Sequence, residues 1–297
     1  MKKKYKGIVL AGGFGSRLYP ITEGISKQLL PIYDKPMIYY PLETLVRIGI
    51  KDILFIVQED DLSIFQKTFG SGEDTGLNFS YKIQKIQRGI SDAYFIAEDY
   101  LSGASSVLAL SDNIFLGKKY FNYAEQALSK MHQIGSSVFG LPVPDPEKFG
   151  VIELDEKDNI IGIEEKPANP KSNLIIPGMY FFDSNACELV KTLKPSARGE
   201  LEITDLIEIY LSQNKLALQR LDETIVWHDT GNADALLEAA QKVKNYEKEN
   251  EIKMGSYEIA AYEKGFIDKD QLLNIAQKFS KSDYGQYIKN VYLGGEN

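Results

Sequence analysis

Short apolar runs alternate along the first half of the chain with longer stretches in which apolar residues recur at helical spacing. Buried strands are expected where the apolar runs lie, at residues 7–11, 53–57, 107–110 and 137–141, with one more near 79–84. Helices are expected between them, over residues 37–48, 62–69, 91–101 and 120–132. Strands that are apolar on both faces and separated by helices predict a mostly parallel sheet covered on both sides.

The middle of the chain has a different pattern. Three strand-like segments follow one another with only short turns between them: residues 150–154, 160–165 and 175–182. Such spacing predicts antiparallel strands inserted into the parallel sheet or added beside it. Further on, the pattern predicts helices over about 185–193, 203–213 and 233–249, a strand near 216–220, and short helices with aromatic anchors from residue 256.

This pattern predicts an α/β fold in two parts. Residues 1–250 form the core, with the antiparallel insertion at about 143–183. Residues 251–297 form a C-terminal helical extension packed on that core.

Composition removes several classes of function. The chain has 297 residues, of which 43% are apolar, and its formal net charge of −8 disfavours partnership with a nucleic acid or an anionic membrane. No apolar run approaches the length of a membrane span. The single cysteine, Cys187, excludes an internal disulfide, and two histidines leave no material for a His-ligated metal centre. Residues 1–4 resemble the start of a signal peptide, but the apolar stretch after them is too short, so we expect a cytoplasmic enzyme or binding protein.

The first apolar run leads directly into a glycine-rich loop, Gly12-Gly13-Phe14-Gly15. Glycines after a strand let backbone N–H groups turn toward a phosphate without a Cβ in the way. Neither common fingerprint fits, because Leu18 stands where a dinucleotide-binding loop has its third glycine and no Gly-Lys-Ser/Thr follows. Residues 14–35 carry a net charge of +1, with Arg17 and Lys27 among the cations. On an acidic chain this favours a bound polyanion, although a tight turn with ordinary solvated basic residues has the same pattern.

Five segments, in this order, are similar to those of one enzyme family: GGFGSRLYP, SKQLLPIYDKPMIYYPLETL, EEKP, KPSARGELEITD and WHDTG. They resemble the glucose-1-phosphate thymidylyltransferases of the sugar nucleotidyltransferase family, from about residue 5 to the C-terminus. The resemblance implies a Rossmann-like nucleotidyltransferase core with an added sugar-binding sheet. It implies Mg²⁺-dependent conversion of dTTP and α-D-glucose 1-phosphate to dTDP-glucose and pyrophosphate, in deoxysugar (rhamnose-type) nucleotide biosynthesis. A homotetramer and inhibition by a downstream deoxysugar nucleotide are implied as well.

The resemblance also assigns roles to individual positions. It implies that the catalytic cations are Arg17, Lys27 and Lys166. It implies nucleotide contacts at Gly12, Gly13, Gly15, Ser16, Gln28, Gln84, Gly89 and Asp112, with Gln84 and Gly89 reading the thymine edge. Sugar-phosphate contacts are implied at Gly150, Glu165, Lys166, Ile176 and Arg198, and metal ligation at Asp112 and Asp229.

Several positions differ from the usual sequence of that family. Arg88-Gly89-Ile90-Ser91-Asp92 replaces Asp-Gly-Leu-Ala-Gln at the base-reading turn, and Ile176-Pro177 replaces Val-Thr in the sugar pocket. No charged catalytic position is lost, but the choice of base and sugar stays open. The alternative is the same chemistry with another pyrimidine triphosphate or another hexose 1-phosphate. A glycosyltransferase is a further alternative, and it would differ by releasing a nucleoside diphosphate in place of pyrophosphate. A catalytically silent relative is another, but it would not need these charged residues.

The site residues also have ordinary structural interpretations. Asp112 and Asp229 could each cap the turn or helix that follows. Gln84 could be an exposed residue at a strand end, and Arg17 could belong to a surface ion pair. His228 is expected to pack beside Trp227 rather than take part in chemistry.

The implied reaction needs charge neutralisation more than proton transfer. The nucleophile is a phosphate oxygen that is already ionised at pH 7, because the second pKa of a phosphate monoester is about 6. No general base is required, which fits a chain with two histidines. Two unit charges about 4 Å apart interact by roughly 4 kcal/mol at an effective dielectric constant near 20, so fixed cations must offset the repulsion between the reactants. Positioning and charge neutralisation are therefore expected to determine the rate.

Overall fold

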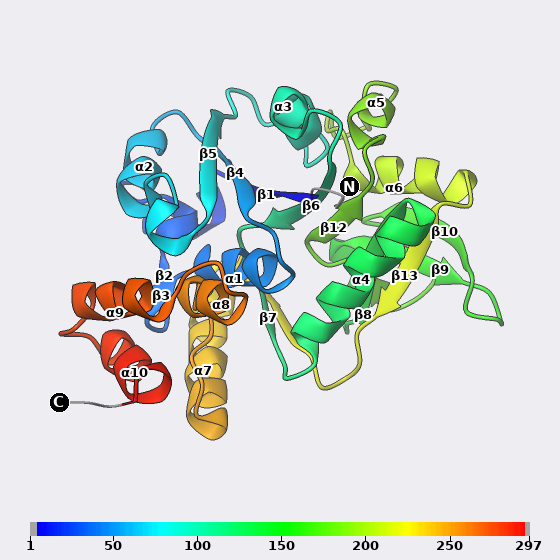
Figure 1. The fold of residues 1–297 in the computed structure, drawn as a ribbon. Coiled ribbons are helices and arrows are strands. Elements are labelled where there is room, and N and C mark those ends of the chain that lie inside the picture. Colours follow the sequence, from blue (N-terminus) through cyan, green and yellow to red (C-terminus); the bar gives the residue numbers. More distant parts are fainter. Residues whose placement is uncertain (1–4, 295–297) are drawn as a thin grey trace.

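The centre of the molecule is a ten-stranded sheet of order β10-β9-β11-β8-β12-β6-β1-β4-β5, with β13 also paired to β8 (Figure 1). The computed structural model describes residues 5–294. Its parallel part contains β1 (Tyr5–Ala11), β4 (Asp52–Val57), β5 (Asn78–Ile83) and β6 (Ser105–Leu110). These are the apolar runs that the sequence pattern marks as strands, so the predicted parallel core is confirmed.

Alternate residues of the central strands face opposite sides of the sheet, and both sides are covered. Val9 and Phe55 belong to a core that includes residues of α1, α2, α4 and α8. Ile8 and Leu54 point to the other side and pack with residues of α3, α5 and α6. The helices on the first side begin and end at Tyr39–Arg47 (α1), Leu62–Phe69 (α2), Tyr120–Ile134 (α4) and Tyr257–Glu263 (α8). Those on the second are Asp92–Leu101 (α3), Ala186–Val190 (α5) and Ile203–Ser212 (α6).

The antiparallel strands extend the same sheet beyond the parallel ones. β12 (Met179–Phe182) lies antiparallel between β6 and β8 (Ser136–Pro142), and β13 (Leu216–Arg220) is parallel to β8. β11 (Leu174–Ile175) pairs with the last residues of β8, Leu141 and Pro142, and is followed outward by β9 (Gly150–Leu154) and β10 (Ile160–Glu165). The small antiparallel sheet expected from the sequence is thus continuous with the parallel one through β8.

The strand predicted over residues 175–182 is in fact two strands, β11 and β12. Ile176, Pro177 and Gly178 separate them, and Pro177 has no N–H to give to a sheet. The Ile176 amide donates to the Gly150 carbonyl at 2.8 Å, and the Gly178 amide donates to Oδ1 of Asn113 at 3.0 Å. The break therefore brings this segment over the end of β6.

A second, two-stranded sheet was not expected from the sequence. β7 (Asn113–Leu116) pairs antiparallel with β14 (Val226–Asp229), and Asp229 lies opposite Asn113 in the register. A short β2 (Pro31–Ile32) and β3 (Lys35–Pro36) hairpin and four 3₁₀ turns, at Ser16–Leu18, Lys27–Leu29, Glu73–Thr75 and Pro146–Lys148, complete the loops of the described chain. The β7–β14 pairing brings residues 112 and 229 together although they are far apart in sequence.

The last helices pack against α1 and the α2–β5 loop. They follow α7 (Ala233–Asn250) and comprise α8, α9 (Lys269–Lys278) and α10 (Asp283–Tyr292). The Tyr257 ring lies 5.1 Å from that of Tyr39, and the Gly255 amide donates to the buried Glu43 carboxylate at 2.6 Å. Division into a core and an extension at residue 250 stays a prediction, and residues 1–4 and 295–297 lie outside the described part.

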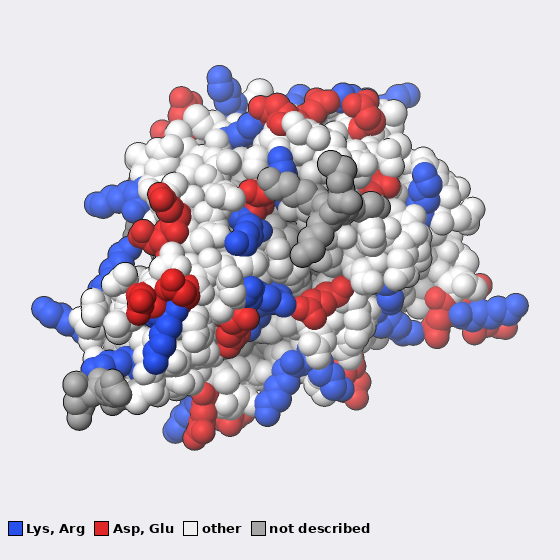
Figure 2. Space-filling model, viewed as in Figure 1, with Lys and Arg blue, Asp and Glu red and all other residues white. Residues whose placement is uncertain are grey.

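Charged side chains of both signs are interspersed over the face in Figure 2. Between residues 5 and 294, the helices are all too short or too polar to cross a membrane.

Candidate active site

The glycine loop after β1 folds back onto the segment that carries Lys27. Gly15 has φ +64°, and a Cβ there would lie 2.9 Å from the Cβ of Lys27, so this position requires glycine on both counts. Gly12 is crowded too, since a Cβ would lie 2.1 Å from Oε1 of Gln84. Nε2 of Gln28 donates to the Gly13 carbonyl at 3.2 Å. The loop thus brings Lys27 and Gln28 together with Gln84, which lies far along the chain from both.

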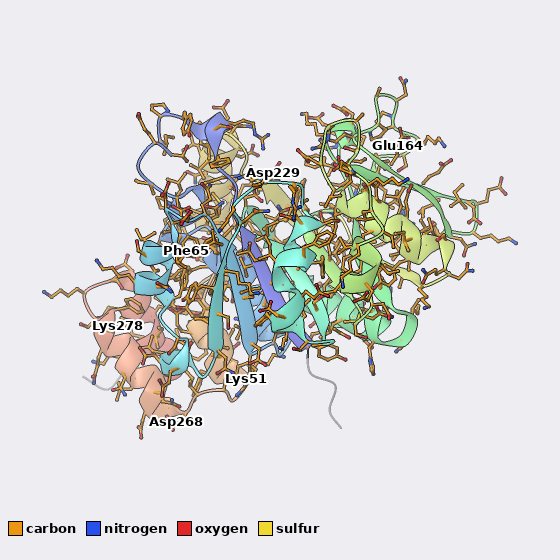
Figure 3. The ribbon with its side chains drawn as sticks, turned by 90° about the horizontal axis from the view of Figure 1, so that it is seen from above. Lys51, Phe65, Glu164, Asp229, Asp268 and Lys278 are labelled. Carbon is orange, nitrogen blue, oxygen red and sulfur yellow. The ribbon has the colours of Figure 1, made fainter. Side chains whose placement is uncertain are left out.

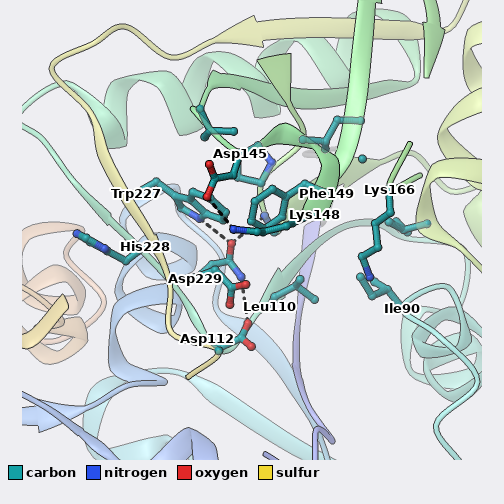
Figure 4. A pocket seen from close by; sticks show the side chains of 18 of the residues that line it. Ile90, Leu110, Asp112, Asp145, Lys148, Phe149, Lys166, Trp227, His228 and Asp229 are labelled. Atoms are coloured by element: carbon teal, nitrogen blue, oxygen red, sulfur yellow. Dashed lines mark hydrogen bonds and ion pairs between the residues drawn. The ribbon is translucent and has the colours of Figure 1, made fainter. Parts of the chain in front are cut away.

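Two carboxylates lie at the end of β6, beside this loop. Asp112 follows β6, and the hydroxyl and amide of Thr230 both donate to its carbonyl, at 2.9 and 3.1 Å. This holds the segment with Asp229 against Asp112, and Figure 4 shows the two side chains close together. Asp229 does not cap α7, because Asn232 does so by accepting from the Ala235 amide. Asp112 is followed by strand β7 and not by a helix.

The electrostatics of the pair are asymmetric. Burial opposes ionisation of Asp112, but the adjacent Lys27, with Nζ 2.5 Å from Oδ2, outweighs it and lowers the pKa of Asp112. Burial, and next the negative charge of Asp112, raise the pKa of Asp229. Lys27 is itself buried, at 7% exposure. A cation bound between Asp112 and Asp229 would remove the repulsion between their two negative charges.

The donor set fits magnesium. Between residues 5 and 294, no group of three or more His, Cys, Asp or Glu side chains is arranged to hold a metal. Mg²⁺ is commonly bound by one or two carboxylates together with substrate phosphates and water, so the two aspartates fit such a site.

A cavity of about 680 Å³ opens beside the carboxylates. Predicted site residues among its lining are Arg17, Asp112, Gly150, Glu165, Lys166, Ile176 and Asp229. In Figure 3, Asp229 lies between the half of the molecule marked by Phe65 and the half marked by Glu164. The cavity is therefore at the carboxyl ends of the strands, where open α/β sheets bind their ligands.

One wall of the cavity carries a carboxylate and an ammonium group. Oε1 of Glu165 lies 3.7 Å from Nζ of Lys166, and Oε2 accepts from the Thr204 hydroxyl at 3.2 Å. Burial raises the pKa of Glu165. Arg17 comes from the turn after the glycine loop and lies against Gly231, where a Cβ would be 2.7 Å from its Nη2. Positive groups from two separate segments of the chain thus line the cavity.

Other predicted residues lie outside this cavity. Arg198 is not in its lining; it donates to Glu202 from Nε and Nη2, at 3.1 and 3.0 Å, and is 4.0 Å from Glu165. Gly89 has φ +100° and packs on Leu201, whose carbonyl oxygen would lie 2.4 Å from a Cβ. Gln84 is buried rather than exposed. Gly12, Gly13, Gly15, Ser16, Lys27 and Gln28 are also outside the lining, on the loop beside it.

Sequence reasoning missed Asn113, which connects three parts of the site. Its Oδ1 accepts from Nε1 of Trp227 at 2.7 Å and from the Gly178 amide at 3.0 Å. Its Nδ2 donates to Oδ1 of Asp112 at 3.0 Å. An amide directly after a strand-end aspartate was the available sequence signal. Trp227 packs on Phe149 with ring centroids 5.1 Å apart, while His228 points away from Asp229 (Figure 4).

Residues 6–246 match the family described as "Nucleotidyl transferase". The chain belongs to this family. It is 46% identical over 286 residues to "Glucose-1-phosphate thymidylyltransferase" of Neisseria gonorrhoeae, which covers 96% of this chain and 99% of that protein. It is 43% identical over 284 residues to the Mycobacterium tuberculosis protein of the same name, and the match covers 95% of this chain and 97% of that protein. The resemblance found in the sequence motifs is therefore confirmed along nearly the whole chain.

Solved structures agree with the nucleotidyltransferase fold. A crystal structure described as a glucose-1-phosphate thymidylyltransferase from Bacillus anthracis, in complex with a sucrose, has a TM-score of 0.73 and 39% identity, covering 80% of this chain and 94% of that one. A UDP-glucose pyrophosphorylase complexed with UDP-glucose has a TM-score of 0.71 at 24% identity, and the match covers 82% of this chain and 99% of that one. At this identity the similarity supports the fold alone.

Proposed function

We propose that this nucleotidyltransferase converts dTTP and α-D-glucose 1-phosphate to dTDP-glucose and pyrophosphate. The names of its relatives support the substrates. The observation that carries the proposal is the pairing of Lys27 with Asp112, which joins the glycine loop to the cavity. That cavity, at about 680 Å³, has the size of an ordinary small-molecule site.

The reaction forms a bond between a phosphate oxygen of the sugar and the α-phosphorus of dTTP. The bond from that phosphorus to the bridging oxygen breaks, and pyrophosphate leaves with the electron pair. Arg17 and Lys27 would offset the charge of the triphosphate, and the fork of Arg17 suits two phosphate oxygens. Lys166 would bind the sugar phosphate, and Glu165 would contact the sugar hydroxyls. Held by these groups, the reactants approach without a general base.

Magnesium belongs to the same proposal. Asp112 and Asp229 would hold it, and it would supply positive charge to the phosphates. The homotetramer and the role in deoxysugar nucleotide synthesis rest on the resemblance. Light scattering of the purified protein tests the tetramer.

A substrate panel tests the function. Each of dTTP, dCTP, UTP and CTP is combined with glucose 1-phosphate and with other hexose 1-phosphates, and pyrophosphate release is measured. We expect the highest kcat/KM for dTTP with glucose 1-phosphate. A different best pair would favour the alternative substrates, and release of a nucleoside diphosphate would identify a glycosyltransferase.

A further inference from the structure

Gln84 lies at the end of β5 with both ends of its carboxamide constrained. Its amide continues the pairing with β4 by donating to the Val57 carbonyl at 2.8 Å, and the residue is 7% exposed. Nε2 lies 3.4 Å from Oδ2 of Asp92, at the start of α3. Oε1 points to the opposite side, so close to Gly12 that only glycine leaves room for it.

Asp92 is held in turn by Arg88. Nε and Nη2 of Arg88 both donate to Oδ1 of Asp92, at 3.1 and 2.6 Å, which leaves Oδ2 to face Gln84. Asp92 is 2% exposed, whereas the Arg88 side chain is 54% exposed and lies over the Phe95 ring at 5.7 Å. The ion pair therefore determines which oxygen of a buried carboxylate meets the glutamine.

A carboxylate oxygen accepts hydrogen bonds and has none to donate, so the edge of Gln84 that faces Asp92 must be the NH₂ group. The carbonyl oxygen must then face the glycine loop. This orientation follows from the donor and acceptor chemistry of the two groups.

We propose that Asp92 is a positioning residue that selects the pyrimidine by fixing the orientation of the Gln84 carboxamide. The inference rests on the proposed function and on the base contact that the sequence resemblance implies for Gln84. With the NH₂ group held by Asp92, the carbonyl oxygen on the side of the glycine loop is the group left to meet the base, and it accepts from the N3–H of thymine or uracil. Cytosine has a lone pair at N3, so two acceptors would face each other and binding would weaken by roughly tenfold or more.

Asp92→Asn tests this with little change in shape. Arg88 needs an acceptor, so it retains Oδ1 of the new side chain, and the NH₂ group takes the place of Oδ2. Gln84 must then turn its oxygen toward residue 92 and its NH₂ group toward the base. We expect the dTTP-to-dCTP ratio of kcat/KM to fall at least about tenfold, because dCTP improves while dTTP weakens. A variant in which both nucleotides lose activity by the same factor would overturn the proposal.

The matched control is Asp99→Asn on the same helix. Asp99 pairs with Lys82, and its side chain is 78% exposed, so the same chemical change should leave the nucleotide ratio as in the wild type. If Asp92→Asn does not fold, Asp92→Ala serves instead, since it frees the carboxamide and lowers the ratio without reversing its orientation. An unchanged ratio in Asp92→Ala counts against the proposal.

A double-mutant cycle separates this inference from the function on which it rests. In the Gln84→Ala background, Asp92→Asn should cause no further change in the nucleotide ratio. An equal change in both backgrounds would show that Asp92 does not act through Gln84. The same ratios are read from calorimetric binding of dTTP and dCTP without sugar phosphate. Failure of wild-type turnover would thus count against the proposed function, while the binding ratios still decide the role of Asp92.

Discussion

Nζ of Lys27 lies 2.5 Å from Oδ2 of Asp112, so the cation after the glycine loop is paired with the carboxylate at the end of β6. Lys27 is 7% exposed, and Asp229 lies beside the pair with its pKa raised by burial and by the charge of Asp112. The ammonium group neutralises a carboxylate that we propose as a metal ligand. We therefore expect Lys27 and a divalent cation to compete for Asp112.

Lys27→Met should separate the contribution of Lys27 to turnover from its competition with the metal for Asp112. We expect turnover to fall about 10²-fold, the loss usual for one donor at developing charge, while the free protein binds Mn²⁺ more tightly because Asp112 loses its internal counterion. Pyrophosphate release measures the first effect, and electron paramagnetic resonance of Mn²⁺ measures the second. Lys118→Met, at an exposed position after β7, is the control. Weaker Mn²⁺ binding in Lys27→Met would contradict the competition.

Arg17→Ala should lower turnover about 10³-fold, a value taken by analogy from arginines that stabilise phosphoryl transfer. Arg17 is exposed and lies against Gly231 at the cavity, so the thermal unfolding midpoint should stay close to that of the wild type. Pyrophosphate release and a circular dichroism melt check the two statements. Arg17→Lys keeps the charge without the fork and should recover only part of the activity. Near-normal turnover in Arg17→Ala would remove the residue from the mechanism.

Asn113→Ala should raise the Mg²⁺ concentration needed for half-maximal activity by about 10- to 100-fold, the usual cost of losing a group that orients a metal ligand. The reason is that Nδ2 of Asn113 holds Oδ1 of Asp112, while its Oδ1 holds Trp227 and the Gly178 amide. A magnesium titration of the initial rate measures the shift. Asn173→Ala, in the loop before β11, provides a comparison outside these contacts. An unchanged magnesium requirement would reduce Asn113 to a structural role.

The sequence was sufficient for the parallel core because the signal there is local. Continuous apolar runs such as residues 53–57 have one stable environment, a strand covered on both faces. The family resemblance assigned Arg17, Lys166, Asp112 and Asp229 to one site, and all four line the same cavity.

The remaining features depend on contacts between distant segments. β7 follows β6 without a turn-rich sequence, and its partner β14 lies over 100 residues further on, so local periodicity does not reveal the pair. The break at Pro177 is hidden in an apolar run that otherwise looks like one strand. The ion pair of Arg198 with Glu202 is likewise not visible in the sequence pattern, and the sugar-phosphate contact implied for Arg198 stays a prediction.

The stability of the C-terminal helices should depend on pH through Glu258. This carboxyl is 2% exposed in α8, accepts from the Tyr284 hydroxyl at 2.9 Å, and has its pKa raised to about 7, chiefly by burial. A folded-state pKa above the unfolded value means that the protonated form stabilises the fold, so the contribution is complete below about pH 4 and is lost as pH rises through about 7. Glu258→Gln keeps the acceptor for Tyr284 and has no proton to lose. We therefore expect the unfolding free energy of the variant, relative to that of the wild type, to rise by up to about 3 kcal/mol between pH 5 and pH 8.

Urea unfolding at several pH values measures the difference, with Glu249→Gln at an exposed position of α7 as control. A difference between Glu258→Gln and wild type that stays constant with pH would show that Glu258 does not titrate in this range.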